Sequence, residues 1–239
     1  MTWQVPKDMH ANLRHRRNLF LAGRDNPKLA REIWLACKRD PLFYFQSFAW
    51  TYDPRLNGEK RVPFISYPFQ DKVLKVLIDS IGKEDVVIEK SRDMGATWMC
   101  LYVIEWRWHF YNSESYLLMS RKEDLVDKVA DPKALMWKID FIHKHLPAWL
   151  MPKVERSKLH FYNVDTNSTI DGESTTGETG KGDRRTAIML DEFASVENGH
   201  RVLEATVDVT NTRWFVSTHN GIGTAFYDCC QKAQEVMLA

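Results

Sequence analysis

An apolar strand leads into a polar turn and then a helix in the segment Val86-Val87-Ile88-Glu89-Lys90-Ser91-Arg92-Asp93-Met94-Gly95-Ala96-Thr97. This order is typical of a phosphate-binding loop, in which backbone N–H groups and the positive end of a helix dipole surround phosphate. Gly95 permits the backbone angles of such a turn, and the Thr97 hydroxyl stands where these loops bind Mg²⁺. The eight residues from Lys90 to Thr97 are therefore a candidate nucleotide site.

The loop lacks the lysine that usually precedes its hydroxyl residue, because Ala96 occupies that position. Lys90, at the first position of the motif, can supply the charge if the loop curls back around the phosphates. Arg92 can add a second cation. The alternative is a loop that has lost its lysine and, with it, its catalysis.

A second apolar strand ends in two carboxylates, in the segment Ala187-Ile188-Met189-Leu190-Asp191-Glu192. In a nucleotide hydrolase, Asp191 and Thr97 would offer Mg²⁺ the hard oxygen ligands that it prefers, and Glu192 would polarise the attacking water. The alternative is a strand that ends in an acidic helix cap. The phosphate loop upstream favours the catalytic interpretation.

A third buried strand, over residues 214–217, runs into Thr218 and Asn220. Ligands of open α/β sheets bind at the carboxyl ends of the strands. Thr218 and Asn220 are therefore expected to face the same cleft and to sense the γ-phosphate.

Strands expected at 86–90, 116–119, 187–190 and 214–217 are separated by helical stretches, which predicts an α/β domain with a mostly parallel central sheet flanked by helices. A further strand is expected at 158–162. Residues 163–185 are rich in small polar residues and are interpreted as loop.

The first 62 residues are interpreted as a helical and aromatic segment that packs on a core formed by residues 63–239. A helix is expected from Pro27 to about Arg39, with Asn26 as its cap. Residues 1–25 contain the basic cluster Arg14-His15-Arg16-Arg17. We interpret this stretch as a mobile or loosely packed arm, in preference to a contact with DNA or another subunit.

The composition limits the class of protein. The chain has 239 residues and a formal net charge of +1, so its total charge gives no sign of nucleic-acid binding. Its four cysteines lack the spacing of a zinc site, and we expect neither a signal peptide nor a membrane span.

These segments, in this order, resemble the large terminase subunit of tailed bacteriophages from about residue 63 onward. Ser91-Arg92-x-x-Gly95-x-Thr97 is similar to that family's phosphate loop, and some members place the lysine where Lys90 stands. Residues 188–194 resemble its acidic motif. Residues 217–221 resemble its coupling motif, with His219 in place of an expected proline. Tyr67-Pro68-Phe69-Gln70 is similar to its adenine-recognition motif, in which Gln70 would pair with the base and Tyr67 or Phe69 would stack on it. The alternative for these four residues is a helix start with a buried aromatic.

The resemblance implies a P-loop NTPase fold of the additional-strand, catalytic-glutamate type that hydrolyses ATP with Mg²⁺. It implies a motor that moves double-stranded DNA into a procapsid. The expected partners are a portal protein, a small terminase subunit and further copies of the chain in a ring, in the host cytoplasm and transiently on the procapsid. Because the sequence ends soon after the coupling motif, the family's nuclease domain is expected to be absent.

The resemblance also points to an arginine finger, sometimes supplied to a neighbouring subunit, in the basic stretch that contains Lys181, Arg184 and Arg185. Contact with DNA phosphates, or a solvated loop, is the alternative for these residues. Two other functions also fit the motifs. One is a superfamily 2 helicase-like ATPase, which would need a second RecA-like domain. The other is a non-catalytic nucleotide-binding module, which Ala96 favours.

Overall fold

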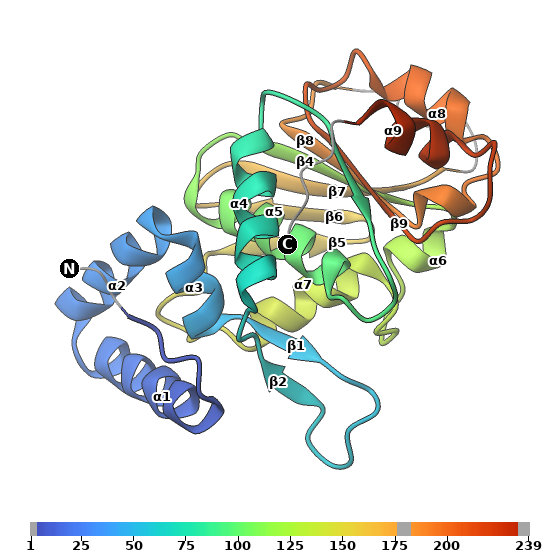
Figure 1. The fold of residues 1–239 in the computed structure, drawn as a ribbon. Coiled ribbons are helices and arrows are strands. Elements are labelled where there is room, and N and C mark those ends of the chain that lie inside the picture. Colours follow the sequence, from blue (N-terminus) through green and yellow to red (C-terminus); the bar gives the residue numbers. More distant parts are fainter. Residues whose placement is uncertain (1–3, 176–182, 234–239) are drawn as a thin grey trace.

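A twisted sheet forms the centre of the computed structural model, which describes residues 4–175 and 183–233 (Figure 1). Within these residues the sheet has seven strands in the order β3-β9-β8-β4-β7-β6-β5. Their bounds are β3 (Val86–Glu89), β4 (Ser115–Ser120), β5 (Val154–Ser157), β6 (His160–Asn163), β7 (Ser168–Ser174), β8 (Ala187–Asp191) and β9 (Arg213–Ser217). The five strands from β3 to β7 in this order are parallel, and β6 and β5 continue antiparallel. The predicted α/β class with a mostly parallel sheet is confirmed.

Strand β9 lies between β3 and β8, so the strand before the phosphate loop and the strand before the acidic pair are not neighbours. Val216 of β9 pairs with Ile88 of β3 on one side and with Asp191 of β8 on the other. All three strands therefore end at the same edge of the sheet. An extra strand at this place is what defines the additional-strand type of P-loop fold.

Helices cover both faces of the sheet, because successive strand residues point to opposite sides. Tyr116, Leu118 and Met189 belong to a core shared with α4 (Pro68–Ser80), α5 (Ala96–Phe110) and α7 (Leu135–Lys144). Leu117 and Ile188 belong to a second core under η1 (Phe193–Ser195), α8 (Gly199–Thr206) and α9 (Ala225–Lys232). Twelve of the fifteen residues of α5 are buried, as expected for a helix that is apolar on all sides.

The N-terminal part contains α1 (Met9–Asp25), α2 (Pro27–Arg39), α3 (Pro41–Phe48) and the hairpin of β1 (Trp50–Tyr52) and β2 (Arg61–Pro63), which extends away from the sheet in Figure 1. Asn26 caps α2 through its side chain, and Pro27 is the first helical residue, as predicted. The ring of Tyr52 packs against Trp137 and Phe141 of α7. The base of the hairpin is thereby fixed to the helix beside it.

The interpretation of residues 1–25 as a loose arm is wrong for the described part, because residues 9–25 form α1 and hold a buried arginine. The Arg16 guanidinium donates to the backbone carbonyls of Gln46 (2.6 Å), Ala49 (2.8 Å) and Phe64 (3.1 Å), and to the Asn12 side chain (2.6 Å). Charge in the sequence suggested a solvated stretch, but Arg16 instead satisfies carbonyls that the fold buries.

The interpretation of residues 163–185 as loop is wrong for residues 168–174, which form β7 between β4 and β6. This strand contains Ser, Thr, Asp and Gly, and backbone pairing on both sides stabilises it despite its low apolar content. After β4, residues 123–126 form a short helix, α6 (Glu123–Val126). Within the part of the chain that the structure covers, no helix has both the length and the apolar character needed to cross a membrane.

Candidate nucleotide site

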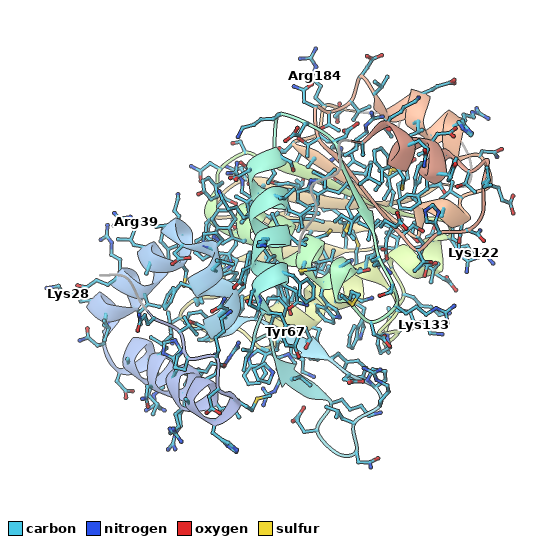
Figure 2. All side chains as sticks on the ribbon, in the orientation of Figure 1. Lys28, Arg39, Tyr67, Lys122, Lys133 and Arg184 are labelled. Atoms are coloured by element: carbon cyan, nitrogen blue, oxygen red, sulfur yellow. The ribbon has the colours of Figure 1, made fainter. Side chains whose placement is uncertain are left out.

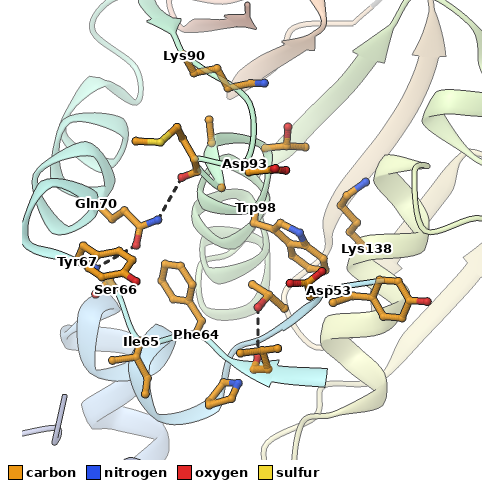
Figure 3. A pocket seen from close by; sticks show the side chains of 18 of the residues that line it. Asp53, Phe64, Ile65, Ser66, Tyr67, Gln70, Lys90, Asp93, Trp98 and Lys138 are labelled. Carbon is orange, nitrogen blue, oxygen red and sulfur yellow. Dashed lines mark hydrogen bonds between the residues drawn. The ribbon is translucent and has the colours of Figure 1, made fainter. Parts of the chain in front are cut away.

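A cavity of about 970 Å³ lies beside the phosphate loop (Figure 3). The β1–β2 hairpin, residues 63–70, the loop from Lys90 to Trp98 and Lys138 of α7 form its walls. This volume is in the upper range of pockets that hold small ligands and cofactors. Of the predicted site residues, the lining includes Tyr67, Gln70, Lys90, Asp93, Met94, Gly95, Ala96 and Thr97. Ser91 and Arg92 are exposed on the same loop.

The phosphate loop takes the turn that its glycine permits. Gly95 has φ +76° and caps α5 from the left-handed region, and Asp93 also has a positive φ of 65°. The first residue of the loop is held by the sheet, since the Lys90 N–H donates to the Ser217 carbonyl at 3.1 Å. The backbone is therefore folded as a loop that opens a helix, in the position that anion binding requires.

Gln70 connects the adenine-motif segment to the phosphate loop. Its amide nitrogen donates to the Met94 carbonyl at 3.2 Å, and its amide oxygen accepts from the Tyr67 N–H at 3.0 Å. Gln70 thus positions the loop in this structure, and its pairing with adenine stays a prediction. The Tyr67 ring is stacked on Phe69 with centroids 5.9 Å apart and is largely exposed at the cavity. Its stacking on adenine also stays a prediction.

Two hard oxygen donors meet where a Mg²⁺ site is expected. The Thr97 hydroxyl lies 3.1 Å from the Asp191 carboxylate, although the two residues are 94 positions apart in the sequence. Burial raises the pKa of Asp191, while the charge of Lys138 and the hydrogen bond from Thr97 act in the opposite direction. Hydroxyl and carboxylate oxygens suit Mg²⁺, so the residues present fit the predicted metal.

Glu192 directly follows β8 and adopts a left-handed backbone, with φ 54° and ψ 36°. A non-glycine residue in this region is uncommon, and such conformations cluster at functional sites. Its carboxylate lies 3.3 Å from the Arg121 guanidinium, which comes from the end of β4. Arg121 was not among the predicted site residues, and only its place after a buried strand could have indicated it.

The segment after β9 contacts the turn after Glu192. The Ser217 hydroxyl accepts from the Ala194 N–H at 3.1 Å, and the Asn220 amide donates to the Ala194 carbonyl at 3.3 Å. Thr218 is half-buried at the same edge of the sheet. The structure therefore brings the predicted coupling segment beside the turn that follows the acidic pair, through hydrogen bonds between its side chains and the Ala194 backbone.

Lys138 is a cation of the cavity that sequence reasoning missed. Its ammonium donates to the carbonyls of Lys133 (2.8 Å) and Ala134 (3.4 Å). Burial lowers the pKa of Lys138 to about 8, against the charges of Asp191, Asp131 and Glu192, which raise it. In the sequence it stands between apolar neighbours on a helix, which gives no signal of a binding role.

The structure does not bring Arg184 and Arg185 to this site within one chain. Both precede β8, so they lie at the opposite edge of the sheet from Asp191. Figure 2 shows Arg184 far from Lys122, which follows the carboxyl end of β4. Arg185 donates to the Ser115 hydroxyl at 2.6 Å and forms an ion pair with Asp171, whereas Arg184 is exposed. Lys181 lies outside the described residues. A role of either arginine in a neighbouring subunit stays a prediction.

The strand order, with β9 between β3 and β8, and the meeting of the phosphate loop with Asp191 and Glu192 define the class. This chain has a P-loop NTPase fold of the additional-strand, catalytic-glutamate type.

Comparison with solved structures then relates the chain to phage terminases. The large terminase of bacteriophage HK97 is similar over 76% of this chain and 38% of its own, with a TM-score of 0.57 and 14% sequence identity. The large terminase of a thermophilic bacteriophage is similar over 67% of this chain and 41% of its own, with a TM-score of 0.50 and 12% identity. The predicted resemblance to large terminases is confirmed at the level of the fold, and the chain spans about two fifths of these proteins. No protein-family model and no curated protein matches the sequence.

Proposed function

We propose that this chain is the ATPase motor domain of a viral DNA-packaging terminase. It would hydrolyse ATP with Mg²⁺ and so drive double-stranded DNA into a procapsid. The observation that carries the proposal is the contact between Thr97 of the phosphate loop and Asp191 of β8, with Glu192 next in the chain. The fold shared with phage large terminases supports it.

In the proposed mechanism, N–H groups of the loop from Lys90 to Thr97 bind the β- and γ-phosphates, and Lys90 adds charge. Thr97 and Asp191 would hold Mg²⁺, which would supply charge neutralisation for the transferred phosphoryl group. Glu192 orients the attacking water. Arg121 contacts one oxygen of the Glu192 carboxylate, Oε2 at 3.3 Å, so the other oxygen can accept a hydrogen bond from the water.

The motor would work as a ring of copies on a portal protein, loaded with the help of a small terminase subunit, in the host cytoplasm. An arginine finger supplied by one copy of the chain would act on the nucleotide bound to the next copy. Of the two predicted arginines, Arg184 fits this role better, because Arg185 is already paired with Asp171.

The test compares Glu192→Gln with Glu204→Gln, an exposed control on α8. ATP affinity is measured with a fluorescent analogue, and Mg²⁺-dependent turnover is measured with double-stranded DNA present. We expect Glu192→Gln to keep its ATP affinity and to lose about 100-fold or more in turnover, the usual contribution of a general base. The Glu204→Gln control should behave as wild type. Undiminished turnover by Glu192→Gln refutes the assigned mechanism.

One observation favours a second candidate function, a nucleotide-binding module without catalysis. Ala96 is buried where a phosphate-loop lysine would stand. Tight ATP binding by the wild type, without turnover at any DNA or Mg²⁺ concentration, would select this alternative.

A further inference from the structure

Four cationic side chains line the cavity, and they differ in their partners. Lys7 is paired with Asp71, and Arg55 is paired with Asp53 and Asp93. The other two are Lys90 and Lys138. Neither has a carboxylate within ion-pair distance among residues 4–175 and 183–233. These two ammonium groups are therefore the ones whose charge is available to an anionic ligand.

Lys138 carries this charge into the cavity from α7. Its two hydrogen bonds go to the carbonyls of Lys133 and Ala134, and an ammonium group has three donors. At least one donor is left for a ligand. Figure 3 shows the Lys138 side chain extending from α7 toward the phosphate loop, with Lys90 on another side of that loop.

A partly buried ammonium without a direct carboxylate partner is unfavourable, because burial removes its hydration. The charges of Asp191 and Glu192 raise the pKa of Lys138 against the effect of burial, although neither carboxylate forms an ion pair with it. A phosphate at this position would supply the missing partner. At position 96 the phosphate loop provides no cation, since the Ala96 side chain is a buried methyl group.

We propose that Lys138 is a phosphate-binding residue of this site, which supplies from α7 the positive charge that the phosphate loop lacks at Ala96. Lys138 and Lys90 bind the polyphosphate from two sides, and Lys138 lies on the side of Asp191. The inference rests on the proposed nucleotide function for the identity of its ligand.

The test uses Lys138→Met, which keeps the length of the side chain and removes its charge, and Lys138→Arg, which keeps the charge. Lys144→Met, an exposed position on the same helix, is the matched control. The dissociation constants of ATP, ADP and inorganic triphosphate are measured with Mg²⁺, together with the melting temperature. We expect Lys138→Met to weaken binding of ATP and of inorganic triphosphate at least tenfold, and of ADP less. Lys138→Arg should recover part of the affinity, and Lys144→Met should match wild type.

The outcomes separate this inference from the proposed function. If Lys138→Met leaves the affinity for inorganic triphosphate unchanged while Lys90→Met abolishes it, Lys138 has no phosphate role and the nucleotide function stands. If Lys138→Met lowers the melting temperature and weakens ATP and ADP equally, the residue is structural and the inference is overturned. If the wild type binds neither ATP nor inorganic triphosphate, both proposals fall.

Discussion

Replacing Arg16 by Met tests whether α1 belongs to the folded unit that shapes the cavity. The guanidinium makes four hydrogen bonds, three of them to backbone carbonyls, and only 6% of the residue is exposed. Burial lowers its pKa to about 9, so it stays charged at neutral pH. Met has a similar length but no donors, so the substitution removes all four hydrogen bonds. The carbonyls of Ala49 and Gln46 keep one other donor each, the Phe64 N–H and the Asn12 amide, whereas the Phe64 carbonyl loses its Arg16 donor.

The expected loss is about 3–5 kcal/mol in the free energy of unfolding, because hydrogen bonds from a charged donor contribute about 1.5–3 kcal/mol each and two of the carbonyls keep another donor. For a chain of this size, each kcal/mol corresponds to a shift of about 2–4 °C, so the melting temperature should fall by roughly 10 °C. Because one of the carbonyls belongs to Phe64 in the cavity wall, ATP affinity should also fall at temperatures where the variant is folded.

The assay is urea unfolding at 25 °C, followed by far-UV circular dichroism, with Arg17→Met as the control. Arg17 is the exposed neighbour on the same helix, and its substitution should change stability by less than about 0.5 kcal/mol. A loss below about 1 kcal/mol for Arg16→Met would refute the reasoning, since it would mean that α1 contributes little to the folded core.

Two further predictions concern the phosphate loop and the buried charge of α5. Gly95→Ala places a Cβ 3.3 Å from the Gln70 amide nitrogen, at a residue whose backbone is left-handed. We expect the variant to lose about 1–2 kcal/mol in the free energy of unfolding and at least tenfold in ATP affinity, measured by titration. An ATP affinity equal to that of the wild type would contradict this prediction. Burial raises the pKa of Glu105, but hydrogen bonds and charge from His109 and His143 outweigh it and hold that pKa at about 2. The folded-state pKa is thus depressed, so Glu105 should contribute about 3 kcal/mol above pH 4.5 that is lost as pH falls toward 2. In urea unfolding, the stability gap between wild type and Glu105→Gln should narrow over this range, and a gap independent of pH would exclude the assigned cause.

The elements that the sequence predicted well are those with strong local signals. Apolar strands such as β8 and β9 are buried on both faces, so their continuous apolar runs identify them. Asn26 and Pro27 mark a helix start through side-chain and backbone chemistry confined to a few residues. Thr97 and Asp191 were predicted as joint Mg²⁺ ligands from their oxygen donors, and the structure places the two side chains 3.1 Å apart. Their metal-binding role stays a prediction.

The features that were missed depend on contacts between distant parts of the chain. Strand β7 has a polar sequence and is held by its neighbours in the sheet, which a local pattern does not reveal. The burial of Arg16 depends on carbonyls 30 to 48 residues away. Lys138 and Arg121 join the site because α7 and the end of β4 fold next to it, and neither residue belongs to a motif.

Ser217, the last residue of β9, forms hydrogen bonds to both segments that flank this strand at the site. Its carbonyl accepts from the first residue of the phosphate loop, and its hydroxyl accepts from Ala194, two residues after Glu192. Ser217 therefore links the start of the phosphate loop to the turn that follows Glu192, the proposed catalytic carboxylate, through two hydrogen bonds. If the loop shifts when phosphate binds, this link is a short connection by which the shift can reach Glu192.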